Sequence, residues 1–124
     1  MALASELVGA GLPPGTASGI GGQYTGLAAA GSSQATGTPV TASMSVVTAA
    51  DGTKAVTLRG QKGDEVWLFN NSASTLKVFP PVGAAIAVVG TGVGTVNAAW
   101  DHLTYKTVIY KCFSSTQWVP MVSA

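Results

Sequence analysis

Short segments rich in apolar residues, separated by polar or glycine-rich stretches, follow one another in the second two-thirds of the chain. The segments are 44–49, 54–58, 65–69, 75–79, 83–89, 96–100, 105–113 and 117–122. Apolar runs of this length are typical of β-strands, and the Gly, Pro, Asn and Ser clusters between the segments are typical of turns. Roughly seven or eight short strands with a turn every 8–12 residues predict an all-β fold, either a β-sandwich or a jelly roll.

Two details of this pattern predict how the strands are arranged. Asp51-Gly52 separates the first two segments, and Asp-Gly favours a two-residue hairpin, which would pair Val47 with Val56. Residues 65–69 are apolar on both faces, and such a strand is usually covered on both faces. Trp67 and Phe69 share one face of it, and with Phe79 they are candidates for a subunit interface.

The N-terminal segment, residues 1–22, follows a different pattern. Residues 2–12 favour a short helix that ends at Pro13-Pro14, and a second turn fits residues 14–20. The pair forms an apolar hook with Leu3, Leu7, Leu12 and Ile20. Helices this short are marginal in water, so we expect the hook to pack on its own domain or on a partner. Residues 23–42 are expected to be an extended linker or arm, followed by the β-domain at 43–124.

Composition narrows the classes of function. The chain has 124 residues, a net charge of +1 and only 9% charged residues, against about 25% in ordinary soluble domains. No charged residue lies between Glu6 and Asp51. Without a cluster of Lys and Arg the chain is not expected to bind nucleic acid. A surface with so little charge suits a protein that is largely surrounded by other protein.

Targeting signals and cysteines give further expectations. The first residues lack the basic start of a secretory signal, and no apolar run reaches the ~18 residues of a membrane-spanning helix. The single Cys112 excludes an internal disulfide and fits synthesis in a reducing cytoplasm.

The residues that usually carry catalysis or bind metals are few. His102 is the only histidine, so no histidine cluster can bind zinc, and nothing marks a serine that it could activate. Cys112 lies in a strongly β segment, where a cysteine usually acts as a small apolar side chain. Asp64 and Glu65 are adjacent and would point to opposite faces of a strand. We therefore expect no catalytic, cofactor or metal site and no enzymatic activity.

Two short motifs are better explained as loops. Gly90, Gly92 and Gly94 lack the spacing of a dinucleotide fingerprint, and no helix pattern follows them. Asn70-Asn71-Ser72 matches a glycosylation sequon, which matters only in a secreted eukaryotic protein.

The aromatic residues leave one alternative open. Trp67, Trp100, Trp118, Tyr105 and Tyr110 could form a platform on which sugar rings stack. Tryptophans in a β-fold are more often core or interface anchors. A glycan-binding site is therefore an alternative to a purely structural role.

Two sets of residues, taken in their order and spacing, point to a family. The first is Leu3, Leu7, Gly11-Leu12-Pro13, Ala17 and Ile20-Gly21; the second is Gly63-Asp64, Asn70-Asn71, Val78-Phe79-Pro80-Pro81, Asn97-Ala98-Ala99, Cys112 and Trp118. In these residues, which span most of the chain, the sequence resembles small bacteriophage virion proteins that decorate the capsid or form head fibres. It differs from them at Ala87 to Gly94, where the family pattern is shorter and richer in Asn.

The resemblance implies a structural virion protein, a homotrimer on the outside of the capsid, made in the host cytoplasm. Its partners would be the major capsid protein and other copies of itself, and it would not bind a membrane. The hook residues Leu3, Leu7, Leu12, Pro13 and Ile20 would anchor it to the capsid. The alternative function is a tail or fibre module that binds a host glycan or receptor.

Overall fold

The computed structural model describes residues 23–88 and 92–123, which contain ten strands and no helix. The strands are β1 (Gln23–Ala28), β2 (Thr38–Val40), β3 (Met44–Ala49), β4 (Ala55–Leu58), β5 (Glu65–Asn70), β6 (Leu76–Phe79), β7 (Ala85–Ile86), β8 (Trp100–His102), β9 (Thr107–Ser114) and β10 (Gln117–Val122). In this part of the chain no helix could cross a membrane. The predicted hook and its residues Leu3, Leu7, Leu12, Pro13 and Ile20 lie outside the described residues.

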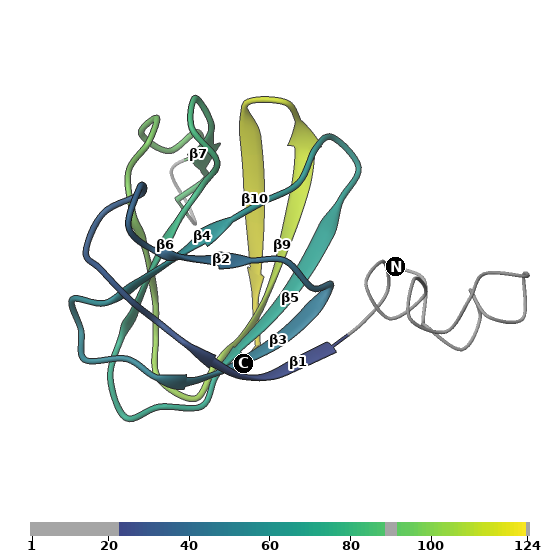
Figure 1. Ribbon diagram of the computed structural model, residues 1–124. Helices are drawn as coiled ribbons and strands as arrows, with labels where there is room; N and C mark the ends of the chain where they lie inside the picture. The colour runs from purple at the N-terminus through teal and green to yellow at the C-terminus, as the bar shows by residue number, and fades with distance from the viewer. Residues whose placement is uncertain (1–22, 89–91, 124) are drawn as a thin grey trace, which may run out of the picture.

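The strands form two mixed sheets (Figure 1). The large sheet has the order β1-β3-β5-β9-β10-β7, and the small sheet has the order β2-β4-β6-β8. Five of the eight strand pairings are parallel. The prediction of an all-β fold is confirmed.

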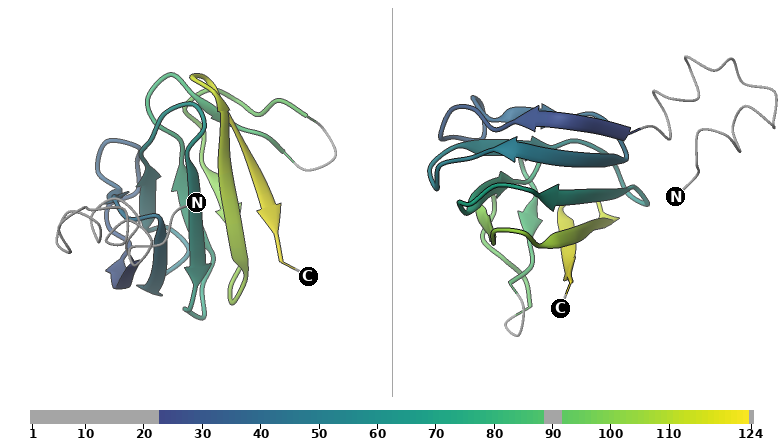
Figure 2. Two further views of the ribbon diagram at one scale, coloured as in Figure 1. Left: turned by 90° about the vertical axis from the view of Figure 1, so that its right-hand side faces the viewer. Right: turned by 90° about the horizontal axis from the view of Figure 1, so that it is seen from below.

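The first six strands wind alternately between the two sheets. The odd-numbered strands β1, β3 and β5 lie side by side in the large sheet, and β2, β4 and β6 do so in the small sheet (Figure 2). In the large sheet Gln23 pairs with Met44, and Met44 pairs with Trp67. The chain therefore makes three similar coils, and neighbouring coils pair at offsets of 18–23 residues. The last coil is covered by antiparallel strands, β9 beside β5 and β8 beside β6.

Residues 23–42 differ from the expected linker or arm. They are extended in part, but β1 pairs with β3 and β2 pairs with β4, so they build the first coil of the same domain. The physical reason is burial, because Leu27 and Val40 are both part of the apolar core. The small, uncharged residues of this segment gave no alternation from which these strands could be predicted.

The predicted hairpin at Asp51-Gly52 is wrong. Val47 pairs with Leu27 and Asn70, whereas Val56 pairs with Thr38 and Val78 in the other sheet. A two-residue hairpin of the expected type needs two positive φ angles, and only Gly52 has one here. The Asp51 carboxylate accepts hydrogen bonds from the backbone N–H groups of Thr53 and Lys54 at 2.9 and 3.0 Å. This cap directs the chain across to the small sheet.

Other predicted strands move or shorten where the backbone is left-handed. The strand expected at 96–100 is instead β8, because Asn97 has a φ of 63° and ends any extended run there. The strand expected at 105–113 begins at Thr107, since Tyr105 has a φ of 57°. The segment expected at 83–89 forms only the two-residue β7.

The core lies between the two sheets and takes residues from both. Val47, Leu68, Val108 and Trp118 come from the large sheet, and Leu58, Leu76 and Val78 come from the small one. On the outer face of the small sheet, the Thr57 hydroxyl donates to the carbonyl of Gln34 at 2.8 Å. The loop between β1 and β2 therefore covers part of β4.

One polar group in the core lacks a partner. Ser45 on β3 is 4% exposed, and its hydroxyl has no hydrogen-bond partner among the described residues. A buried hydroxyl without a partner costs the free energy of its lost hydration.

We therefore expect Ser45→Ala to leave the free energy of unfolding unchanged or to raise it by up to about 1 kcal/mol. Urea unfolding checks this. The matched control is Ser72→Ala, because the Ser72 hydroxyl donates to Asn70 Oδ1 at 2.7 Å, and that variant should lose about 1–3 kcal/mol. Equal losses in the two variants would contradict the prediction.

Candidate interaction surface

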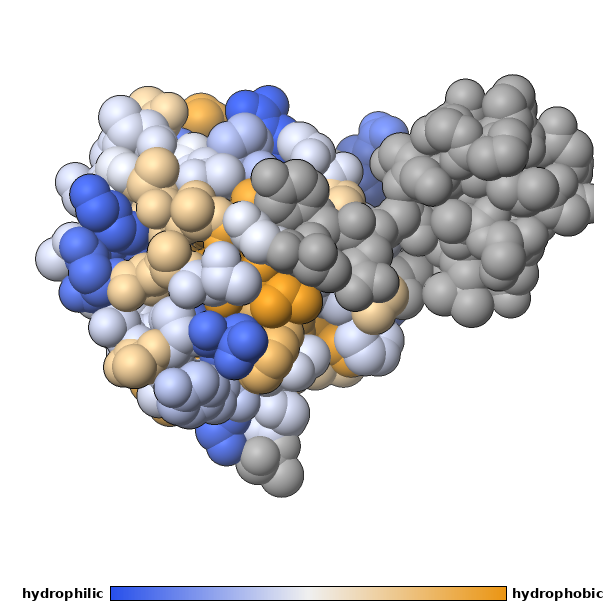
Figure 3. Space-filling view, turned by 60° about the horizontal axis from the view of Figure 1, so that its bottom comes forward, coloured by the Kyte–Doolittle hydropathy of each residue, from blue (hydrophilic) through white to orange (hydrophobic). Residues whose placement is uncertain are grey.

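The outer face of the large sheet carries a contiguous group of apolar side chains. Strand alternation places Val66 and Leu68 in the core and turns Trp67 and Phe69 outward, where they are half-buried. Two rows cross the sheet in register, Met44–Trp67–Ile109–Met121 and Val46–Phe69. We call these six residues the apolar stripe: Met44, Val46, Trp67, Phe69, Ile109 and Met121. Apolar colours gather on this side of the molecule (Figure 3).

The apolar stripe is hollowed and has no charge within it. Met44, Val46, Trp67 and Phe69 line a shallow hollow of about 180 Å³. The nearest charged pair, Glu65 and Lys111, lies in the adjacent row at one end. A face without charges can be covered at little electrostatic cost, because no ion has to be removed from water.

The charged groups beside the stripe are already engaged. Glu65 Oε2 accepts a hydrogen bond from the Trp67 indole N–H at 3.1 Å. The Lys111 ammonium donates to the carbonyl of Gly63 at 2.9 Å. Both groups therefore frame the stripe and leave its centre apolar.

The three predicted interface residues do not share one face. Trp67 and Phe69 lie in the apolar stripe. Phe79 belongs to β6 in the small sheet and is half-buried on the face opposite Val78, which lies in the core. Sequence alternation identified the outward residues of each strand, but it could not assign the strands to different sheets.

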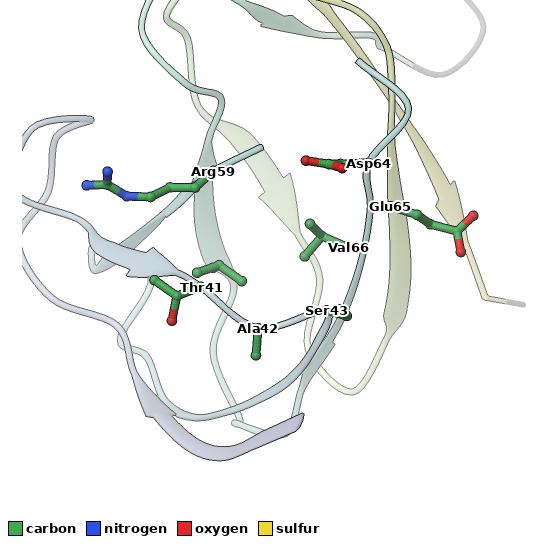
Figure 4. Close-up of a pocket in the computed structure, with 8 residues that line it drawn as sticks. Thr41, Ala42, Ser43, Arg59, Asp64, Glu65 and Val66 are labelled. Atoms are coloured by element: carbon green, nitrogen blue, oxygen red, sulfur yellow. The ribbon is translucent and has the colours of Figure 1, made fainter. Parts of the chain in front are cut away.

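A second hollow, of about 160 Å³, is polar and lies where the chain crosses between the sheets (Figure 4). Arg59 and Asp64 lie on two sides of it, whereas the Glu65 carboxylate points away (Figure 4). Asp64 Oδ2 accepts the backbone N–H of Gln61 at 2.8 Å, so this carboxylate caps a turn. The two adjacent carboxylates therefore do not face each other as an acid and base would have to.

His102 is fully buried and holds two fixed hydrogen bonds. Its Nε2 lies 2.6 Å from the carbonyl oxygen of Lys106. A carbonyl only accepts, so Nε2 carries the proton and Nδ1 accepts from the Tyr110 hydroxyl at 2.8 Å. Trp100 packs edge-on against both rings. This arrangement joins β8 to β9 and leaves the imidazole no open side for a substrate.

Burial lowers the pKa of His102 below its ordinary 6.5, although the bond to the Lys106 carbonyl opposes the shift. The unfolded chain then binds the proton near pH 6.5 while the folded chain does not. The contribution of neutral His102 to the free energy of unfolding should be complete above about pH 6.5. It should fall as the pH decreases from there toward the lower pKa of the folded state.

Urea unfolding at several pH values between 7.5 and 5 measures this fall. Since His102 is the only histidine of the sequence, its ring protons can be titrated by NMR without ambiguity. A pKa at or above 6.5 in the folded protein would contradict the assignment.

Cys112 fits the predicted role of a small apolar side chain. It is buried, its Sγ lies 3.1 Å from the carbonyl oxygen of Ser114, and burial followed by the charge of Asp64 raises the pKa of its thiol. A thiol held in its neutral form is a poor nucleophile.

Asn70, which belongs to the sequon and to the residues of the resemblance, has a structural role inside the domain. Its side chain is fully buried at the end of β5. The amide Nδ2 donates to the carbonyls of Ser74 and His102 at 2.8 and 3.2 Å, and Oδ1 accepts from Ser72. The amide is therefore not open to glycosylation. The sequence could have indicated this burial. Asn70 follows Val66 and Leu68 at every second position of the strand, so its side chain points to the same inner face.

The aromatic residues do not form one platform. Trp67 lies in the apolar stripe, Trp118 is in the core, and Trp100 packs beside His102 in the small sheet. Tyr110 is buried, and burial raises the pKa of its hydroxyl well above 10. Tyr105 is exposed.

The glycine loop is built around close backbone contacts. Val88 and Gly92 exchange two backbone hydrogen bonds of 3.0 and 3.1 Å, and a Cβ at Gly94 would overlap the Ile86 carbonyl. The positive φ of Gly92 and the close approach at Gly94 explain these two glycines without a bound phosphate, whereas Gly90 lies outside the described residues.

Metal ligands are not clustered in the described ranges 23–88 and 92–123, which contain no group of three His, Cys, Asp or Glu residues that could hold an ion.

Comparisons with family models, with curated proteins and with solved structures found no match.

Proposed function

We propose that this chain is a structural virion protein that binds the outside of a phage capsid, as a decoration protein or the base of a head fibre. Residues 1–22 dock on the major capsid protein, and the β-domain contacts other copies through the apolar stripe. The trimeric state follows from the resemblance to decoration proteins. The two facing sheets are then the β-sandwich of this protein.

The observation that carries the proposal is the apolar stripe. A half-buried Trp67 and Phe69, flanked by Met44 and Ile109 in register, form a face without charge. Parallel strands are normally covered on both faces, yet the outer face of β3 and β5 has this apolar surface. Such a face suits a protein that works in contact with other protein.

The residues that could carry chemistry support a structural role. His102 and Cys112 are buried, and the hydrogen bonds of His102 and Asn70 hold the domain together. The fold therefore uses its polar side chains for internal contacts and presents an apolar surface outward.

The test uses purified capsids from a phage that lacks this gene product. Full-length protein should co-sediment with the particles, and a variant with Leu3, Leu7, Leu12 and Ile20 replaced by Ser should not. A control variant with Ser5, Thr16 and Ser18 replaced by Ala keeps the apolar residues and should bind like the original. Failure of the original protein to bind the particles overturns the proposal. Equal binding of all three proteins overturns the anchoring role of residues 1–22.

A further inference from the structure

The apolar stripe is small for an interface between copies. Its side chains span four strands about 4.8 Å apart and two rows about 7 Å apart, which gives roughly 200–300 Å². A standard interface buries about 800 Å² per partner. The stripe therefore does not hold a second copy firmly by itself, whereas its size fits one short apolar segment.

The chain carries such a segment at the right place. The chain enters the large sheet at Gln23, which lies in the same row of paired residues as Met44 and Trp67. The 22 residues before Gln23 include Leu3, Leu7, Leu12 and Ile20 and a single charge, on Glu6. Extended, they span up to about 70 Å, far more than the width of about 20 Å between β1 and β10.

Attachment to β1 also favours this segment over other partners. A tethered segment acts at an effective concentration in the millimolar range. A second copy at micromolar concentration is thus outcompeted by roughly a thousandfold before differences in contact area are counted.

We propose that in the free protein residues 1–22 pack across the apolar stripe of their own chain. They leave it when they dock on the capsid, and the stripe then becomes available to neighbouring copies. This inference rests on the proposed function. Binding to the capsid and association between copies are then coupled, because copies associate through the stripe only after residues 1–22 have docked on the capsid.

The test uses the full chain without particles, at a concentration where sedimentation shows monomers. Methionine methyl groups and tryptophan indole N–H groups serve as NMR probes, because Met44, Met121 and Trp67 are in the stripe whereas Trp100 and Trp118 are not. Replacing Leu3, Leu7, Leu12 and Ile20 by Ser should shift the three stripe signals and leave the other two indoles in place. The Ser5, Thr16 and Ser18 to Ala variant is the control.

Sedimentation over a range of concentrations gives the second readout. Copies of the Leu and Ile to Ser variant should associate at a concentration at least roughly tenfold lower than the original protein, because the tethered competitor is lost. Unchanged stripe signals, or association at the same concentration in both proteins, would overturn the inference. Neither result depends on particle binding, so failure here is separable from failure of the proposed function.

Discussion

Replacing Trp118 by Ala should lower the free energy of unfolding by about 3–5 kcal/mol, the largest loss expected from a single side chain of this domain. Trp118 is 1% exposed and lies on β10, in register with Cys112 on β9 and Ile86 on β7. A Cβ added at Gly60 would lie 3.1 Å from its ring, so the backbone packs directly against it. Removing the indole leaves a cavity that this close-packed backbone cannot fill by small shifts.

Urea unfolding followed by circular dichroism measures this loss. Val122→Ala on the same strand is the matched control, because Val122 is 43% exposed and lies outside the apolar stripe, and it should cost less than about 1 kcal/mol. A loss below about 1 kcal/mol for Trp118→Ala would show that the core does not depend on the docking of β10.

Asn70→Ala should lower the free energy of unfolding by about 2–4 kcal/mol, because several buried polar groups lose their partners together. The carbonyls of Ser74 and His102 lose the amide donor, and the Ser72 hydroxyl loses its acceptor Oδ1. These bonds join the turn after β5 to the end of β8. The expected loss therefore comes from hydrogen bonding more than from lost volume.

The neighbouring residue gives a control of identical chemistry. Asn71 is exposed, and its backbone N–H, which Ala retains, donates to the carbonyl of Val47 at 2.8 Å. Asn71→Ala should therefore change stability by less than about 0.5 kcal/mol. Equal effects of the two substitutions, measured by chemical unfolding, would show that the buried amide has no special role.

Strand positions were predictable where burial alternates along the strand. Residues 65–69 and 117–122 were predicted as strands, and β5 and β10 occupy these positions. Alternation is a local property, since each side chain points to one face or the other. It also identified Trp67 and Phe69 as outward residues before their surroundings were known.

Strand pairing was not predictable by the same means. Met44 and Trp67 pair across 23 residues, and the connection between them passes through the other sheet. No local pattern reports such a contact. The Asp51-Gly52 turn favoured a hairpin on local grounds, but the Asp51 carboxylate accepts from the backbone N–H groups of Thr53 and Lys54 instead. Phe79 was grouped with Trp67 for the same reason, because sheet membership depends on distant pairings.

The three-coil winding has a consequence for how this domain can change in length. Each coil adds one strand to each sheet, and its residues pair with those 18–23 positions away. Inserting or removing one whole coil would keep both sheets in register and change the height of the stack by about 4.8 Å. An insertion of half that length would move every following strand to the wrong sheet. Lengths among relatives of this domain should therefore differ in steps of one coil.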